Sequence, residues 1–155
     1  MAKKKLNHAG FWRRISATLV DILITTPILI SLLYLFGFEK YLLLEINDNL
    51  YSYVENQKAL IVRHIIDAIS TIIIALYSVL FITSKKMATP GKMLFGIHVV
   101  DINGKKLTKK RAAARFFASI LSALLLGIGL IMIAFTKEKT ALHDLICKTR
   151  VVNNE

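Results

Sequence analysis

The most informative residue for chemistry is a carboxylate inside an apolar run. Asp21 is the one charged residue between Ile15 and Phe36, a stretch of 22 residues. At about 1.5 Å per residue, a helix of this length spans about 33 Å, enough to cross a hydrocarbon core of about 30 Å. A carboxylate within such a helix costs at least about 2.5–3.5 kcal/mol, so it has to be paired, face a polar cavity or titrate. Arg13 and Arg14 precede the run, and Arg14 shares a helical face with Asp21.

A second set of charged and titratable residues lies in another apolar run, at about 59–83. Arg63 and Asp67 are four residues apart and His64 and Asp67 are three apart, so their side chains are neighbours on a helix. Asp67 lies toward the end of its span opposite to that of Asp21. Carboxylates at two depths with a histidine nearby are what a proton or cation path would use. The alternative is that both acids are paired and act as structural locks between helices.

Further titratable residues lie outside these two runs. Asp101 follows a pair of valines, and His143 and Asp144 are adjacent near the end of the chain. None of these residues has partners at metal-ligand spacing, and no nucleophile–base set is present, so the sequence predicts no metal, no cofactor and no enzymatic activity. A partner for Asp21 must come from another element, and three candidates on the basic side are His143, Lys92 and Arg115.

The composition is that of a membrane protein. The chain has 155 residues, of which 55% are hydrophobic and 20% charged, with a mean hydropathy of +0.55. We therefore expect one membrane domain over residues 1–155. The net charge of +11 is concentrated beside the apolar runs, which favours contact with anionic lipid headgroups over binding of nucleic acid. Cys147 is the single cysteine and excludes an internal disulfide.

The charges between the runs predict how the chain is oriented. Residues 1–14 carry five Lys or Arg and no acid, and residues 84–115 carry nine against Asp101 alone. Residues 37–59 carry four acids and two lysines. Because Lys and Arg accumulate in cytoplasmic loops, the N-terminus and the 84–115 segment are predicted to be cytoplasmic.

The 84–115 segment contains two turn signals. Thr89-Pro90-Gly91-Lys92 lacks the pattern of a phosphate-binding loop and is interpreted as a turn that leads into an interfacial segment. Asn103-Gly104 separates Ile97–Asp101 from Lys105–Thr108, so a β-hairpin is predicted over about 97–108. An isolated hairpin is marginal in water, and the tail at 149–152 is predicted to add a strand, forming a small cytoplasmic β element.

The third apolar run, at about 112–135, permits two topologies. A plain span would place the tail outside, whereas pairing of the tail with the hairpin requires the tail to be cytoplasmic. Gly127 and Gly129 interrupt the run and favour a re-entrant hairpin, because non-helical backbone at depth is tolerated where protein or water satisfies it. The predicted fold class is thus an all-α integral membrane protein with two transmembrane helices, at about 15–36 and 59–83, and a third run that re-enters or crosses.

Three stretches together resemble the RDD family of small bacterial membrane proteins: GFWRRISATLVDILI, ATPGKMLFGIHVVDINGKKLT and LHDLICKTRVV. The family takes its name from one arginine and two aspartates. The resemblance implies Arg14 (or Arg13) and Asp21 for the first two, and Asp144, with Asp101 as a rival, for the third. It also implies an Arg14–Asp144 contact at the inner interface, and a proposed role in moving solutes or ions, since some members resemble monovalent cation/proton antiporters.

The expected function is therefore transport of a solute or ion, such as exchange of a monovalent cation for a proton, using the intramembrane Asp. The alternative is a non-transporting membrane scaffold or accessory subunit in which the buried charges fix helix pairing. Three runs are too few to enclose a wide pore, so a transporter of this size is expected to be a homo-oligomer. The expected location is the bacterial inner membrane, multi-pass, with a cytoplasmic N-terminus.

Overall fold

The computed structural model describes residues 7–38, 53–124, 132–133, 136 and 139–154. Its elements, in chain order, are α1 (Phe11–Leu35), α3 (Tyr53–Ile82), α4 (Pro90–Leu94), β1 (Ile97–Asp101), α5 (Lys109–Leu124), α7 (Leu142–Ile146) and β2 (Thr149–Asn153). The chain divides into two compact units, each described by itself. The first unit comprises Met1–Ile22 with Ala75–Glu155, and the second comprises Leu23–Ile74.

Two helices are long and apolar enough to cross a membrane: Phe11–Leu35, with 25 residues, and Leu60–Ile82, with 23. They agree with the predicted spans at about 15–36 and 59–83. Pro27 lies inside α1, where Ser31 Oγ donates to its carbonyl oxygen at 2.8 Å. Large apolar side chains, such as Leu23 and Ile61, are exposed along both helices, as lipid-facing surfaces would be.

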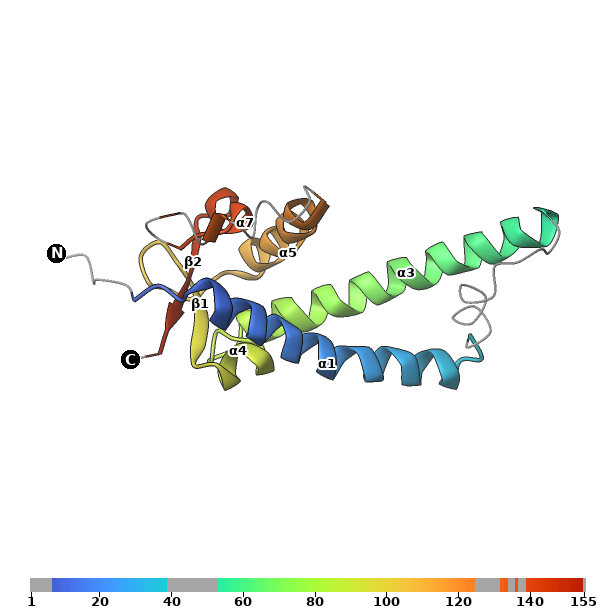
Figure 1. Ribbon diagram of the computed structural model, residues 1–155, viewed down its shortest axis with the longest axis horizontal. Coiled ribbons are helices and arrows are strands. Elements are labelled where there is room, and N and C mark those ends of the chain that lie inside the picture. Colours follow the sequence, from blue (N-terminus) through green and yellow to red (C-terminus); the bar gives the residue numbers. More distant parts are fainter. Residues whose placement is uncertain (1–6, 39–52, 125–131, 134–135, 137–138, 155) are drawn as a thin grey trace. The chain divides into compact units, whose positions relative to one another are not determined.

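A two-stranded antiparallel sheet joins distant parts of the first unit (Figure 1). Strands β1 and β2 pair in a register that places Val99 opposite Val151. The segment before α1 extends this pairing, since Ala9 N–H donates to the Val151 carbonyl at 2.9 Å and His8 bridges to Val152. Residues 7–9, β1 of the 84–115 segment and β2 of the tail therefore meet in one structure.

The core of the first unit lies between this sheet and the adjoining helices. Ala17 of α1 and Ala112 of α5 are buried together with side chains of both strands. The remaining buried hydrophobic residues of the cluster are Ala9, Ile82, Ile97, Val99, Leu107 and Val151. Three of the eight side chains are those of alanines, which lets the helices and the strands approach closely at these positions.

The predicted hairpin over 97–108 is only half right. The first strand and its pairing with the tail are present, but Lys105–Thr108 is not a strand. The turn forms where expected, with Gly104 at φ 76° and Asp101 Oδ1 accepting the backbone N–H groups of Asn103 and Lys105, each at 2.8 Å. On the second edge of β1, Asp101 N–H donates to the carbonyl of Lys105 at 2.9 Å, but Val99 N–H donates to the carbonyl of Met87 at 2.8 Å. A returning strand would have no continuous ladder to join.

The third apolar run begins and ends within the first unit. Helix α5 covers its first part, and Arg115 on this helix contacts Asp144 in α7, beyond the end of the run. Residues 125–131, including Gly127 and Gly129, lie outside the described part of the chain, so the predicted break there is not described. The two flanks of the run are nonetheless held together by side chains.

Candidate functional site: two buried carboxylate clusters

Asp144 is the centre of the first cluster. The short helix α7 places its side chain in the interior, fully buried, where Oδ2 also accepts the backbone N–H of Ala141 at 3.3 Å. Arg14 of α1 donates from Nη1 to Oδ2 at 2.5 Å. Arg115 of α5 donates to Oδ1 from Nε at 3.0 Å and from Nη2 at 2.8 Å, the forked geometry preferred for guanidinium and carboxylate. Thr149 Oγ1 adds a further bond to Oδ1 at 3.2 Å.

Arg14 also binds the backbone of two other segments. Its Nη2 donates to the carbonyl oxygen of Lys139 at 2.6 Å, and its Nε to that of Ala9 at 3.2 Å. This one guanidinium therefore connects the segment before α1, the segment before α7 and the Asp144 carboxylate. Lysine could not replace it, because an ammonium group lacks the planar fork of donors.

The electrostatics of this first cluster keep Asp144 ionised. Burial alone would raise the pKa of Asp144, but Arg115 and Arg14 outweigh it and hold the pKa well below its usual range. Burial, together with Arg115, lowers the pKa of His143 to about 4. The neutral imidazole can then accept from Arg115 Nη2 at 3.4 Å through Nε2. Two guanidinium groups against one carboxylate leave the cluster with a net charge of +1.

Asp21 is the centre of the second cluster. Its carboxylate accepts from Thr89 Oγ1 at 2.5 Å, from the Gly91 backbone N–H at 2.8 Å and from Tyr77 Oη at 3.1 Å. The ammonium of Lys92 lies 3.6 Å from Oδ2 and 3.2 Å from Thr89 Oγ1. Asp21 thus satisfies the start of helix α4, which Thr89 occupies as N-cap without using its own side chain for capping.

Gly91 allows α4 to lie directly against α1. A Cβ atom at this position would overlap the Ala17 carbonyl oxygen and lie 2.8 Å from the Asp21 carboxyl carbon. Such distances are far below van der Waals contact, so only glycine fits without a shift of one backbone. The absence of a side chain therefore brings the Gly91 N–H within reach of Asp21.

Charged groups of both clusters act on Lys92. Burial and then Arg115 lower the pKa of Lys92 to about 8, whereas Asp21 and Asp144 act in the opposite direction. Its side chain and that of Asp21 retain 16% and 14% exposure, compared with none for Asp144. The Asp21 cluster is thus more accessible than the Asp144 cluster.

The structure separates the sequence candidates into groups. Arg14 and Asp144 are in contact, as the resemblance implied, and Lys92 is the predicted partner of Asp21 that contacts it. Arg115 and His143, the other two candidates for that role, lie at Asp144 instead. Asp101 organises the turn described above and is 3.9 Å from Arg111. Arg13, next to Arg14, is exposed and donates to Asn153 Oδ1 at 3.0 Å.

Three candidates belong to the second unit. Arg63 and Asp67 form an i,i+4 pair at 3.9 Å on α3, with 40% and 64% of their side chains exposed. His64 is also exposed on this helix. Within the described part of the chain, no group of three or more His, Cys, Asp or Glu is arranged to hold a metal ion.

Sequence reasoning missed four contributors: Tyr77, Thr89, Gly91 and Thr149. The sequence predicted a turn at Thr89-Pro90-Gly91-Lys92 that leads into an interfacial segment. Thr followed by Pro also indicates the start of a helix, because Pro is favoured at the first helical position after a Thr cap. A polar helix start next to an apolar run is expected to have a buried polar partner. No sequence signal singles out Tyr77 or Thr149, whose roles depend on tertiary packing.

The fold and the two clusters define a small, mostly helical protein with two helices long and apolar enough to cross a membrane and with buried ion pairs in its first unit. A model of the RDD family matches residues 8–148, and the chain belongs to this family. The uncharacterized protein YxaI of Bacillus subtilis (strain 168) is 36% identical, over 93% of this chain and 96% of its own. The uncharacterized protein YckC of the same organism is 27% identical, over 92% of this chain and 83% of its own. No solved structure matches.

Proposed function

We propose that the protein is a multi-pass protein of the bacterial inner membrane, with its N-terminus, its 84–115 segment and its tail in the cytoplasm. The hydrogen bonds of residues 7–9 and β1 with β2 support this topology, because segments that share a sheet lie on one side of a membrane. The five and nine basic residues of the first two segments support the cytoplasmic side. The third run then enters and leaves on that side, which the Arg115–Asp144 contact favours over a plain span.

Cysteine labelling in intact cells tests this topology. In a Cys147→Ser background, a cysteine at Asp48 is expected to react with an impermeant maleimide added from outside. A cysteine at Asn154, which is exposed, is expected to react only after the membrane is opened. Labelling of Asn154→Cys in sealed cells would rule out the re-entrant third run.

The activity that we propose is movement of a monovalent cation, exchanged for a proton, with Asp21 as the group that binds both. The observation that carries this proposal is the Lys92 ammonium, which lies among the oxygens of Asp21 and Thr89. An ammonium group carries the same charge as an alkali cation. Oxygen atoms that are arranged around the Lys92 ammonium could therefore also bind an alkali cation. Asp21 also lies within α1, about 15 Å from its start at Phe11, where a carboxylate is costly unless it serves a purpose.

The exchange needs no covalent chemistry. Asp21 as a carboxylate binds either one proton or one monovalent cation, so each exchange is electroneutral at the site. While the cation or the proton is bound to Asp21, the Lys92 ammonium lies away from the carboxylate, and it pairs with Asp21 when neither is bound. Asp144 is a poor carrier by comparison, because its two guanidinium partners and full burial keep it charged and inaccessible. We assign to it a structural role that fixes the cytoplasmic segments on α1.

Flux measurements on purified protein in liposomes test the role of Asp21. Asp21→Asn keeps the size of the side chain but removes its charge and its titration, so we expect folded, inserted protein whose sodium, potassium and proton flux is abolished. Asp67→Asn is the matched control, because it removes a carboxylate from the other apolar helix, and its flux is expected to be unchanged. Normal flux in Asp21→Asn would end the assignment.

The second candidate is a membrane scaffold or accessory subunit, favoured by the number of donors fixed on Asp21. In that case Asp21→Asn changes assembly rather than flux, because a neutral amide leaves Lys92 without its counter-charge. Absence of flux in the unchanged protein, together with loss of a co-purifying partner in Asp21→Asn, would favour this function.

For either function we propose a homo-oligomer, since the exposed Arg63–Asp67 pair of α3 is better accommodated against a second copy than against lipid.

A further inference from the structure

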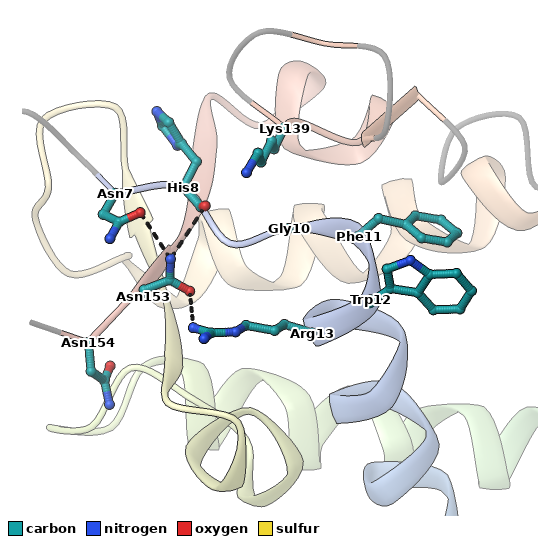
Figure 2. A pocket seen from close by; sticks show the side chains of 9 residues that line it. All are labelled: Asn7, His8, Gly10, Phe11, Trp12, Arg13, Lys139, Asn153 and Asn154. Carbon is teal, nitrogen blue, oxygen red and sulfur yellow. Dashed lines mark hydrogen bonds between the residues drawn. The ribbon is translucent and has the colours of Figure 1, made fainter.

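A pocket of about 430 Å³ lies where the chain enters α1, at the edge of the sheet (Figure 2). Its described lining residues come from the segment before α1, the first turn of α1, the segment before α7 and the end of β2. These residues are Asn7, His8, Gly10, Phe11, Trp12, Arg13, Lys139, Asn153 and Asn154. Neither the Asp144 cluster nor the Asp21 cluster contributes its acid to it.

The charge of this pocket is positive. Arg13 and Lys139 are exposed cations, and none of the described lining residues is acidic. The first turn of this 25-residue helix also contains no acidic residue that would offset the positive end of the helix dipole beside Gly10. Cationic side chains and the positive end of a helix together attract an anion.

Neighbouring groups hold the Arg13 side chain and the Lys139 backbone in place. Arg13 Nη1 donates to Asn153 Oδ1 at 3.0 Å, and Asn153 Nδ2 in turn donates to Asn7 Oδ1 at 3.0 Å (Figure 2). Lys139 adopts a left-handed backbone conformation, φ 48°, and its carbonyl accepts from Arg14 at 2.6 Å. The two adjacent arginines thus have different roles. Arg14 fixes the backbone of Lys139, while Arg13 lines the pocket.

The aromatic residues of the pocket place it at the level of lipid headgroups. Trp12 is 76% exposed and packs edge-on against Phe11, with ring centroids 5.4 Å apart. An exposed Trp at the end of an apolar helix is typical of the membrane–water interface. A nucleic acid or a soluble anion would not require this exposed apolar surface beside the cations.

We propose that this pocket binds the phosphate group of an anionic phospholipid, with Arg13 and Lys139 pairing with the phosphate and Trp12 packing on the glycerol and upper acyl chain. The proposal rests on the membrane location proposed above and not on cation exchange. Arg13 is suited to the phosphate because its planar fork can donate to two of its oxygens. The group recognised is an anionic phosphate, which a lipid headgroup or free phosphate could supply.

Native mass spectrometry of the full chain in detergent, titrated with phosphatidylglycerol or phosphatidylcholine, tests the proposal. The double variant Arg13→Gln/Lys139→Gln is expected to bind phosphatidylglycerol about 10- to 30-fold more weakly, at about fivefold for each basic residue near a membrane surface. Lys105→Gln/Lys106→Gln is the matched control, because it removes the same charge from exposed positions outside the pocket, and it is expected to retain the affinity.

Inorganic phosphate distinguishes the two sources. Phosphatidylglycerol binding that depends on Arg13 and Lys139 and is not displaced by millimolar phosphate supports the lipid. Binding of inorganic phosphate with the same dependence, without binding of phosphatidylglycerol, overturns it. Equal losses in the double variant and its control also overturn the pocket, since charge alone would then suffice.

A third variant guards against misfolding. If the double variant fails to fold by circular dichroism, Lys139→Glu places an acid in the pocket at an exposed position and is expected to abolish preference for phosphatidylglycerol over phosphatidylcholine. Retained preference in that variant would refute the site. Incorporation of each variant into phosphatidylcholine nanodiscs checks the membrane location separately.

Discussion

Replacement of Asp144 by alanine is expected to destabilise the protein by about 3–5 kcal/mol, the cost of leaving buried charges without their counter-charge. Two guanidinium groups, those of Arg14 and Arg115, lose their common acceptor in this variant. Thr149 Oγ1 and the Ala141 N–H lose one as well. Denaturant titration of the protein in detergent, followed by circular dichroism, measures the change in the free energy of unfolding.

The exposed pair on α3 supplies the control for this prediction. Asp67→Ala removes a carboxylate whose side chain is 64% exposed, and surface ion pairs contribute about 0–1 kcal/mol. A large loss in Asp144→Ala with a small one in Asp67→Ala would show that burial of the partners, rather than loss of an acid, sets the cost. Similar losses in both variants would contradict this account.

The double variant Arg14→Ala/Asp144→Ala separates the pair from its surroundings. It is expected to be less damaged than the sum of the single variants, because each single change already breaks the Arg14–Asp144 bond. The rescue should remain incomplete, since Arg115 stays buried and the carbonyl groups of Lys139 and Ala9 lose their donor. Strictly additive losses would mean that the two side chains do not interact.

Hydropathy was enough to predict both long helices, but not that residues 7–9 join the sheet. The apolar runs specify helices by themselves, because their length and composition leave few alternatives. The strand at Ile97–Asp101 and its pairing with the tail also followed from β-branched residues. The absence of a second strand at Lys105–Thr108 could not be predicted, because the bond of Val99 to Met87 depends on tertiary packing and has no signal in the local sequence.

The two clusters show a similar limit. A charged residue in an apolar run signals that a partner exists, but not which one, so Lys92, Arg115 and His143 were equal candidates for Asp21. Arg115 could have been assigned to an acid other than Asp21, because it lies, like Arg14, at the start of an apolar run and is expected to have its own acidic partner. Chain spacing gave no way to assign it to Asp144, which lies 29 residues further on.

Gly91→Ala is expected to displace α4 from α1 and to weaken the Asp21 cluster as a whole. The added Cβ would overlap the Ala17 carbonyl and crowd the Asp21 carboxylate, both parts of a helix that cannot easily yield. Overpacking of this kind costs typically about 1–3 kcal/mol, and loss of the Gly91 N–H bond to the partly buried Asp21 carboxylate adds to it. The same denaturant titration in detergent measures the loss of stability.

Gly10→Ala is the matched control, because a Cβ at Gly10 would meet nothing within 4 Å. Its stability is expected to stay within about 1 kcal/mol of the unchanged protein, since replacing an unstrained glycine can even stabilise slightly. If Asp21 binds the transported cation, Gly91→Ala should also lower flux in liposomes, because Thr89 and Lys92 move with α4. A Gly91→Ala variant as stable as Gly10→Ala would mean that α4 does not pack on α1 through this glycine, and the assignment of Asp21's partners would fall with it.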